Sequence, residues 1–277
     1  MPELPEVETV VRYLQPQLRG KRILAVQAGR KRLRHPVPQK ALRRLLGQTF
    51  TAVSRRGKWI VLSLEQDCLL IHLGMTGRLQ MLASVSPGDP HCHFVCQLAP
   101  EPAHLCYSDP RRFGAILVFS SDDAQRYLES QLGPEPFSVT AHELHCRLQA
   151  TSRPIKVALM DQSLLAGLGN IYTDEALYQA GFSPYRAANT FSFDETRQLL
   201  RAIRTVLRRA IACHGSSIRD YMFGENGRGT YQDEFLVYGR QGQPCRRCSY
   251  PLQRQRLAGR STYFCPYCQP LDRSPGG

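Results

Sequence analysis

The spacing of hydrophobic and polar positions divides this chain into a strand-rich first half and a helical second half. Val7, Val10, Val11 and Leu14 recur at the spacing of one helix face, which predicts a first helix beginning near Pro5. Between residues 21 and 121, short runs of Val, Ile, Leu and aromatic residues alternate with turn residues, as in a β-sandwich or barrel. The predicted strands are 23–27, 49–54, 59–64, 69–73, 79–82, 94–98, 105–107 and 115–119.

The pattern becomes helical after residue 121. Helices are predicted over 122–132 and 138–149, and the chain remains mostly helical to about residue 213. Ser192 and Glu195 have the spacing of a capping box, which opens an amphipathic helix. Residues 215–236 are rich in Gly and polar residues, so they form either a functional mobile loop or an ordinary long connection. The predicted fold class is therefore α+β, with two domains.

The charge balance points to a polyanionic partner. The chain has 277 residues, of which 36 are Lys or Arg and 23 are Asp or Glu, a net charge of +13. Such a surface favours phosphate contacts, although a basic enzyme without a nucleic-acid partner has the same balance. The sequence contains no apolar run long enough to span a membrane and no signal-peptide pattern, so we expect a cytoplasmic protein without a membrane partner.

Four of the ten cysteines form two C-x-x-C pairs near the carboxyl end. The first pair is Cys245 and Cys248, and the second is Cys265 and Cys268. The 16 residues between the two pairs are enough for a β-hairpin. Four thiolates suit a closed structural Zn²⁺ site, whereas two disulfides are disfavoured in a reducing compartment. The predicted hairpin tip would project Arg260, either as a solvated turn residue or as a phosphate contact.

A second metal site around His91, Cys92, His93 and Cys96 is disfavoured. In a regular strand Cys92 and Cys96 point to one face, whereas His91 and His93 point to the other.

The first residues offer covalent chemistry. Once Met1 is removed, Pro2 carries a free secondary amine, and α-amino groups are partly neutral near pH 7.7–8.0. A neutral amine attacks an electrophilic carbon and forms a Schiff base, and Glu3 and Glu6 could act beside it as general acid and base. The alternative for the carboxylates is a structural role at the positively polarised start of the first helix.

Two turns in the strand region carry large side chains where core residues are not normally found. Met75 lies in HLGMTGR, and Arg111 and Phe113 lie in DPRRFG. They are either wedges for base steps and an Arg for an orphaned base, or residues that close the core under the loops. Lys58 is either a phosphate contact or an edge-strand lysine, and Asn170, after the Gly turn of LLAGLGN, either caps a helix or faces a phosphate.

Together these residues resemble the formamidopyrimidine-DNA glycosylase family of base-excision repair enzymes. The resemblance covers nearly the whole chain, and its motifs follow in family order: PELPEVE, RRGK, HLGMTGR, DPRRFG, AGLGNIYTDEAL, VYGRQG and the four-cysteine finger. It implies an N-terminal β-sandwich with a flanking N-terminal helix, followed by a helix–two-turn–helix domain with a β-hairpin zinc finger. The implied parts are the catalytic domain at 1–132, a linker at 133–137, the helical domain with a lesion-covering loop at 138–236, the finger at 237–269 and a flexible tail at 270–277.

The resemblance also implies roles for individual residues. Pro2 would attack the sugar C1′ of a flipped oxidised purine, such as 8-oxoguanine opposite cytosine or a formamidopyrimidine, and Glu3 would protonate the opening ring, with Glu6 as a supporting carboxylate. The Schiff base would then cleave the abasic site by β,δ-elimination. Residues implied to contact damaged double-stranded DNA are Lys58, His72, Met75, Arg111, Phe113, Lys156, Asn170 and Arg260, of which Met75, Arg111 and Phe113 would fill the void and Arg111 would face the orphan cytosine. The family also favours a monomer.

Two alternatives remain at the level of sequence. The first is an enzyme of the same superfamily that removes oxidised pyrimidines, although the PELPE start argues for the purine branch. The second is a zinc-dependent damage sensor without catalysis, which would need neither Pro2 nor Glu3.

Overall fold

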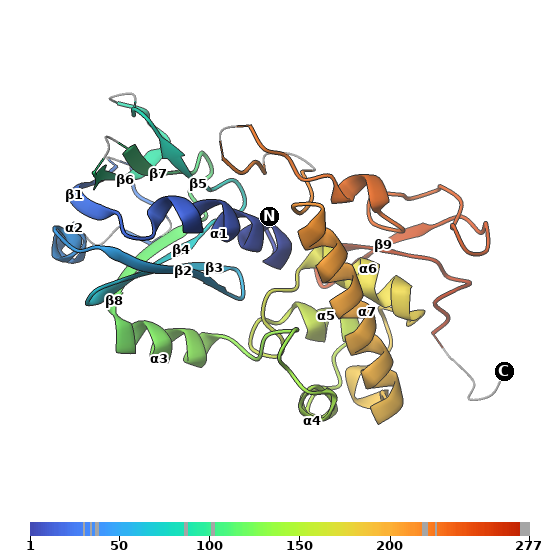
Figure 1. Cartoon of the computed structure of the whole chain (residues 1–277). Helices are drawn as coiled ribbons and strands as arrows, with labels where there is room; N and C mark the ends of the chain where they lie inside the picture. The colour runs from blue at the N-terminus through green and yellow to red at the C-terminus, as the bar shows by residue number, and fades with distance from the viewer. Residues whose placement is uncertain are drawn as a thin grey trace. The chain divides into compact units, whose positions relative to one another are not determined.

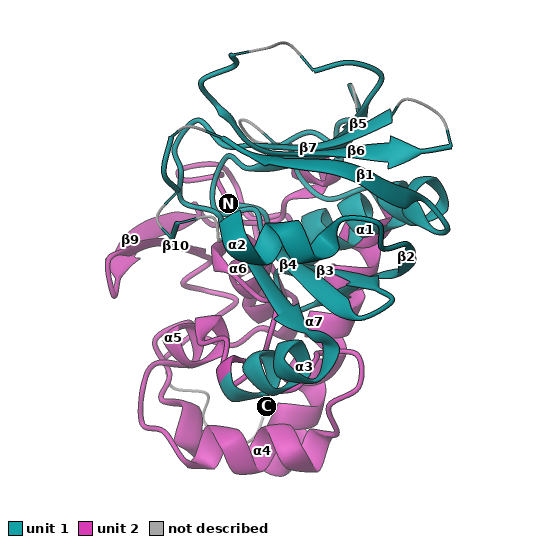
Figure 2. Ribbon diagram, turned by 90° about the vertical axis from the view of Figure 1, so that its left-hand side faces the viewer, with its two compact units in different colours: residues 1–130, 213–230 teal, residues 131–212, 231–277 magenta. Residues whose placement is uncertain are grey.

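The chain divides into two compact units, each described separately (Figure 2). The computed structural model describes residues 1–29, 31–33, 35–36, 39–85, 88–100, 103–217, 221–224 and 226–271. Unit 1 comprises residues 1–130 and 213–230, and unit 2 comprises residues 131–212 and 231–277. None of the helices in the described ranges has both the length and the apolar composition needed to cross a membrane.

Unit 1 contains two antiparallel four-stranded sheets, which confirms the predicted sandwich. One sheet has the order β1-β6-β7-β5, with β1 (Arg22–Ala28), β6 (Cys92–Ala99), β7 (Ala103–Ser108) and β5 (Arg78–Leu82). The other has the order β2-β3-β4-β8, with β2 (Phe50–Arg56), β3 (Trp59–Leu64), β4 (Asp67–His72) and β8 (Ala115–Ser120). Every predicted strand is present; β3 alternates between buried and half-buried positions, whereas β4 is a nearly continuous buried run.

Helix α1 (Leu4–Leu18) packs against strands of both sheets in unit 1 (Figure 1). Its contacts reach β2 and β3 of one sheet and β5 of the other. Val7 and Leu14 are completely buried and share one core cluster with both sheets, as their helical spacing predicts. A short α2 (Gln39–Leu42) and the adjoining 3₁₀ turn Arg43–Leu45 were not predicted, since only Leu42 and Leu45 bury a side chain there.

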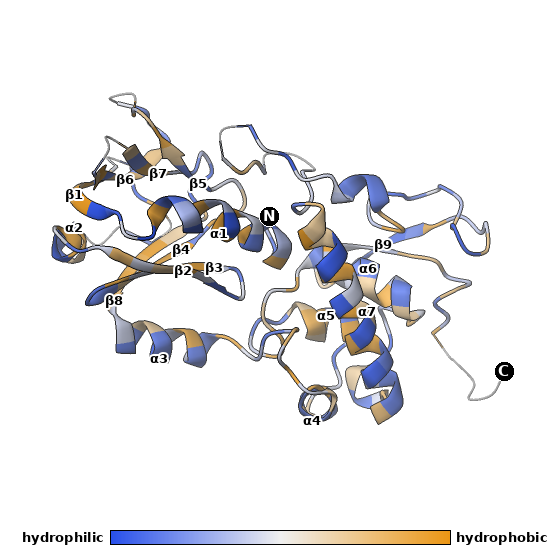
Figure 3. Ribbon diagram, in the orientation of Figure 1, coloured by the Kyte–Doolittle hydropathy of each residue, from blue (hydrophilic) through white to orange (hydrophobic). Residues whose placement is uncertain are grey.

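Unit 2 is helical and ends in a β-hairpin. Its helices are α4 (Ala141–Gln149), α5 (Ile155–Met160), α6 (Asn170–Ala180) and α7 (Phe193–Ala212), and its hairpin pairs β9 (Gln253–Leu257) with β10 (Arg260–Phe264); α3 (Ser121–Gln131) precedes them at the end of unit 1. The predicted capping box of α7 is present, because Glu195 N–H donates to Ser192 Oγ and Ser192 N–H donates to Glu195 Oε2. Figure 3 shows alternating hydrophilic and hydrophobic bands along this helix.

Three boundaries differ from the sequence prediction. Helix α4 begins later than residue 138, because Thr140 is its N-cap and accepts the Glu143 N–H at 3.1 Å. The predicted linker is anchored in unit 2, since Ala166 N–H donates to the Pro134 carbonyl. Residues 213–230, expected within the helical domain, pack with unit 1, where Tyr221 and Phe223 contact its core. Parts of two predicted segments lie outside the described residues: 218–220 and 225 of the lesion-covering loop, and 272–277 of the tail.

Candidate active site and nucleic-acid interface

The amino-terminal turn is buried and held by hydrogen bonds. Pro2 is buried, and Glu3 is only 2% exposed. Glu3 is the N-cap of α1, and its backbone N–H donates to Glu6 Oε2 at 2.7 Å. Terminal residues usually fray unless they are tied down. The nitrogen that becomes an amine when Met1 is removed therefore belongs to an ordered turn.

Glu6 connects this turn to a distant segment of unit 1. Its Oε1 accepts the Ser216 N–H at 2.8 Å and the Ser216 hydroxyl at 3.2 Å. The Tyr221 hydroxyl donates to the Glu6 backbone carbonyl at 3.1 Å. Gly215 has a φ of +78°, and a Cβ there would lie 2.7 Å from Glu6 Oε1. Both Glu6 oxygens are thus occupied as acceptors, and besides its expected role at the helix start this carboxylate holds Ser216.

The two motif loops of the sandwich are joined through Asp109. Asp109 Oδ1 accepts the Thr76 hydroxyl at 2.6 Å and the Arg111 N–H at 3.2 Å, whereas Oδ2 accepts the Gly114 N–H at 2.8 Å. Asp109 is completely buried, so these bonds are shielded from water. Gly74 allows the close approach of the loops, because a Cβ there would lie 2.5 Å from the Gly114 nitrogen.

This joint structure displays an aromatic ring and a guanidinium group. Phe113 is 47% exposed, which excludes the alternative that it closes the core under the loop. The Arg111 guanidinium carbon lies 4.9 Å from the centre of the Phe113 ring, a cation–π arrangement. Met75, on the partner loop, is partly buried. The structure therefore brings the loops bearing these three predicted residues together.

Lys58 and His72 lie at the ends of neighbouring strands. Lys58 is 6% exposed, in the turn between β2 and β3, and the next residue, Trp59, pairs with His72 across the sheet. Gly74 N–H donates to His72 Nδ1 at 3.0 Å, which leaves the proton of a neutral imidazole on Nε2. Burial, and then the charge of Lys58, lowers the pKa of His72 to about 4. His72 is therefore a neutral hydrogen-bond donor at physiological pH.

In unit 2, Lys156 and Asn170 both bind the hairpin strand β10. Lys156 Nζ donates to the Ser261 carbonyl at 2.8 Å and to Thr262 Oγ1 at 3.0 Å, and Asn170 Nδ2 donates to the same Ser261 carbonyl at 3.0 Å. Lys156 also forms an ion pair with Asp174 at 2.8 Å, with side-chain exposures of 1% and 0%. Burial raises the pKa of Asp174, and the Lys156 ammonium opposes that shift.

These contacts hold Ser261, the residue next to Arg260. The hairpin turn has φ angles of 47° at Ala258 and 77° at Gly259, as in a tight primed turn, and Arg260 is exposed as the first residue of β10. The ammonium of Lys156 is directed at Asp174, Ser261 and Thr262 rather than at the surface. Asn170 is the first residue of α6, whose N-cap is Gly169, so it does not cap this helix with its side chain.

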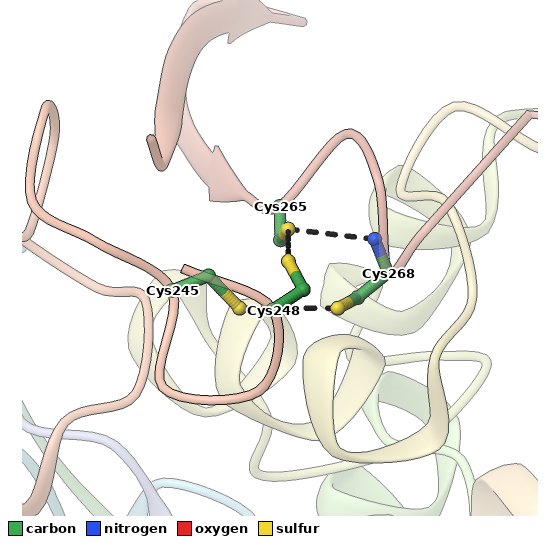
Figure 4. A group of neighbouring side chains, drawn as sticks. All are labelled: Cys245, Cys248, Cys265 and Cys268. Atoms are coloured by element: carbon green, nitrogen blue, oxygen red, sulfur yellow. Dashed lines mark hydrogen bonds between the residues drawn. The ribbon is translucent and has the colours of Figure 1, made fainter. Parts of the chain in front are cut away.

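The four predicted zinc cysteines form one cluster (Figure 4). The sulfur atoms of Cys245, Cys248, Cys265 and Cys268 all lie within 4.8 Å of one another. The Arg247 N–H donates to Cys245 Sγ and the Cys268 N–H donates to Cys265 Sγ, both at 3.4 Å. Backbone donors of this kind stabilise thiolate ligands.

The second metal site is absent from the described residues, although the reason differs from the predicted one. His93 is completely buried, and its nitrogens contact the Lys31 and Asp109 carbonyls, both at 3.0 Å. Cys96 lies in the core cluster, whereas Cys92 lies 3.1 Å from Cys106. Cys92 and Cys96 were expected on one face, which is wrong because the strand register shifts between Cys92 and Phe94.

Sequence reasoning missed the residues that fasten the predicted ones. Thr76, Asp109 and Asp174 were included only as letters of quoted motifs, and Ser216 only as part of the Gly-rich segment 215–236. A buried Asp directly before Pro110 is a signal for a turn that its carboxylate stabilises. The partners of Asp174 and Ser216 are distant in sequence, and local patterns do not reveal them.

Comparisons with known proteins agree along most of the chain. Models of the formamidopyrimidine-DNA glycosylase N-terminal domain, the formamidopyrimidine-DNA glycosylase H2TH domain and the zinc finger found in FPG and IleRS match residues 1–116, 132–222 and 242–271. The formamidopyrimidine-DNA glycosylase of Geotalea daltonii is 40% identical, over 97% of this chain and 100% of its own length. That of Gluconobacter oxydans is 44% identical, again over 97% and 100%.

Solved structures give the same result. A point mutant of the Lactococcus lactis FPG in complex with Fapy-dG-containing DNA has a TM-score of 0.89 and 35% identity, covering 97% of this chain and 100% of its own. A Lactococcus lactis Fpg complex with DNA containing an abasic site has a TM-score of 0.88 and 34% identity, with coverages of 97% and 99%.

Proposed function

Because the chain belongs to the formamidopyrimidine-DNA glycosylase family, we propose that it excises oxidised purines from duplex DNA and then cleaves the resulting abasic site. The substrates we propose are 8-oxoguanine opposite cytosine and formamidopyrimidines, since the chain begins with the PELPE motif of the purine-specific branch. The observation that carries the proposal is the buried Pro2-Glu3 pair in a turn fixed by Glu6.

The first step uses the amine of Pro2. Its nitrogen attacks C1′ of the flipped nucleotide, the bond from C1′ to the base breaks, and the base leaves and takes up a proton in place of the one that the amine loses. Glu3 protonates the ring oxygen as the sugar opens, which yields an iminium between Pro2 and C1′. The turn geometry supports this role because a fixed amine and a neighbouring carboxyl group need little reorganisation before attack.

The iminium then serves as an electron sink. Loss of a proton from C2′ breaks the bond from C3′ to its phosphate oxygen, and a second elimination breaks the bond at C5′. Free Pro2 amine is restored when the remaining sugar fragment hydrolyses from it. In this scheme Glu6 positions Glu3 and the segment around Ser216, because both of its oxygens are already occupied by donors.

We propose that two groups of residues contact the DNA. Met75, Arg111 and Phe113 fill the void left by the flipped nucleotide, with Arg111 facing the orphan cytosine; exposed Phe113 under the Arg111 guanidinium suits insertion between bases. Phosphates are bound by Lys58, His72, Asn170 and Arg260, and the Nε2 proton of neutral His72 supplies a donor. For Lys156 we propose an indirect role, since it holds the hairpin strand that begins with Arg260.

We also propose one structural Zn²⁺ on the four cysteines. Zn–S bonds of about 2.3 Å in a tetrahedron require sulfurs about 3.8 Å apart. The Cys245–Cys268 and Cys248–Cys265 sulfurs are 3.8 Å and 3.5 Å apart, which fits that ion. The metal would fix the base of the hairpin. Cys248→Ser should lower the bound zinc and loosen the hairpin, whereas Cys146→Ser, at an exposed cysteine of the same unit, should keep one zinc per chain.

The experiment that tests the activity is borohydride trapping on duplexes of defined lesion. The substrates carry 8-oxoguanine opposite cytosine, 8-oxoguanine opposite adenine, or thymine glycol, and the adduct is mapped by peptide mass spectrometry. We expect a covalent adduct at Pro2, strongest opposite cytosine, and Pro2→Gly should weaken turnover greatly while retaining most DNA binding. A main adduct on thymine glycol would move the protein to the pyrimidine branch, and binding without an adduct would favour a damage sensor.

A further inference from the structure

Two cysteines outside the zinc cluster lie side by side on the sandwich of unit 1. Cys92 begins β6 and Cys106 lies in β7, and their sulfur atoms are 3.1 Å apart. Leu105 and Tyr107, on either side of Cys106, belong to the core cluster, so Cys106 points to the opposite face of its sheet. The register shift after Cys92 turns its side chain toward that same face.

The two sulfur atoms are close to bonding distance. An S–S bond measures about 2.05 Å, so the two sulfurs need to approach by only about 1 Å. The contact with Cys106 lowers the pKa of the Cys92 thiol, and the contact with Cys92, followed by burial, raises the pKa of the Cys106 thiol. Cys92 is therefore the thiol of this pair that loses its proton more readily.

The two sulfurs also differ in access. Cys92 is half-buried and lines an open pocket together with Lys31, Asp89 and His104. Cys106 is only 4% exposed. The pair thus combines a reachable nucleophile with a shielded partner, which is the arrangement of a peroxide-sensitive dithiol.

We propose that Cys92 and Cys106 are a redox modification site that hydrogen peroxide converts into a cross-strand disulfide. The Cys92 thiolate attacks one peroxide oxygen, the O–O bond breaks, and the departing hydroxide takes up a proton to form water, which leaves Cys92 as a sulfenic acid. The Cys106 sulfur then attacks the Cys92 sulfur. The S–O bond breaks, and the hydroxide leaves with the Cys106 proton as a second water. Two thiols and one peroxide give one disulfide and two waters.

Two other buried thiols of the sandwich lack these properties. Burial, and then the charge of Asp67, raises the pKa of Cys68 to about 11, and burial raises that of Cys96 to about 12. Both are therefore poor nucleophiles at neutral pH. Reactivity toward peroxide among the sandwich strands should be confined to Cys92, with Cys106 as the resolving thiol.

Cys92 lies next to residues that hold the start of the loop 109–114. The residues on both sides of Cys92 contact Asp109: its N–H donates to the His91 carbonyl at 2.9 Å, and its carbonyl lies 3.0 Å from His93 Nε2. A disulfide at Cys92 would therefore form next to the contacts that hold the loop carrying Arg111 and Phe113. The inference itself concerns thiol chemistry and does not depend on the proposed glycosylase activity.

The test uses the zinc-loaded full-length protein. It is treated with equimolar hydrogen peroxide, remaining thiols are alkylated under denaturing conditions, and unreduced peptides are analysed by mass spectrometry. We expect one linked peptide pair that joins Cys92 to Cys106 and has lost two hydrogen atoms, and a thiol reductant should restore both thiols. Cys106→Ser should leave Cys92 as a sulfenic acid that dimedone traps, and Cys92→Ser should leave Cys106 reduced.

A control variant and a contrary outcome complete the test. Cys146→Ser removes an exposed cysteine of unit 2 and should leave the Cys92–Cys106 link intact. The proposal is overturned if Cys92 and Cys106 remain fully alkylated while Cys146 or the zinc cysteines are oxidised. It is also overturned if Cys92 links equally to several cysteines, because the preformed contact would then have no effect on the choice of partner.

Discussion

Glu6 and Ser216 are joined by two hydrogen bonds, of 2.8 Å and 3.2 Å, although 210 positions separate them in the chain. The same Glu6 carboxylate receives the Glu3 N–H at 2.7 Å, so one side chain fixes both the amino-terminal turn and the segment that returns to unit 1 after α7. The position of Pro2 and Glu3 therefore depends on the contact between Glu6 and Ser216. This dependence can be tested without any substrate.

Gly215→Ala should destabilise unit 1 by disturbing this contact. The φ of +78° is unfavourable for alanine, by about 1–2 kcal/mol, and the added Cβ would lie 2.7 Å from Glu6 Oε1. Gly20→Ala is a matched control in the same unit, since Gly20 has a φ of +81° with nothing within 4 Å of its Cβ. Urea unfolding should show a larger loss for Gly215→Ala than for Gly20→Ala. Equal losses would mean that the chain near Glu6 relaxes without resistance.

Asp109→Asn should loosen the loop that displays Arg111 and Phe113. Asp109 accepts donors on both carboxylate oxygens, and an amide can accept on only one side, so a buried donor is left unpaired at a cost of about 1–3 kcal/mol. Trypsin should then cleave faster after Arg111 and Arg112. Asp89→Asn, at an exposed aspartate, should leave this cleavage rate unchanged. An equal rise of the cleavage rate in both variants would argue against this role of the Asp109 hydrogen bonds.

The sandwich could be predicted because its strands are short runs of Val, Ile, Leu and aromatic residues bounded by turn residues. Strand β3, for example, was predicted over 59–64 and is observed at Trp59–Leu64. The four cysteines were found by their spacing, and their sulfurs do converge. In such cases a local pattern determines the structure, because the side-chain period or the ligand spacing is itself the physical constraint.

Other features depend on partners that no local pattern indicates. Lys156 was expected near DNA, but nothing in its sequence neighbourhood identifies Asp174 or the β10 carbonyl that its ammonium contacts. Cys92 departs from strand alternation because of a bulge, and bulges have weak sequence signatures. The described residues of the segment after α7 belong to unit 1, where Tyr221 and Phe223 pack, partly buried, against the core, and composition does not decide between the cores of the two units.

His72 should remain neutral well below the ordinary histidine range. Its folded pKa is about 4, whereas the unfolded value is about 6.5. The unfolded chain therefore takes up a proton before the folded chain does, so the contribution of His72 to stability is complete above pH 6.5 and is lost as the pH falls toward 4. In NMR titration the His72 ring signals should not shift between pH 7 and 5.5. As the pH falls through this window, the stability of His72→Gln should decrease less than that of the wild type. A His72 ring that titrates near pH 6.5 would contradict the prediction.

Lys156 and Asp174 should stabilise unit 2 through their ion pair, so that the effect of changing one residue depends on the other. Lys156→Met leaves the Asp174 carboxylate buried without its cation, and removal of one partner of a buried pair typically costs about 3–5 kcal/mol. Lys156→Met with Asp174→Asn removes both charges, so urea unfolding of the double variant should show a smaller loss than the two single losses added together.

Binding to a lesion duplex, measured over a range of salt concentrations, separates this role from a phosphate contact. If Lys156→Met leaves stability unchanged but lowers the salt dependence of binding by about one charge, Lys156 meets a phosphate directly. We expect instead a loss of stability and of hairpin order, because the Lys156 side chain is only 1% exposed and its ammonium contacts Ser261 and Thr262 next to Arg260.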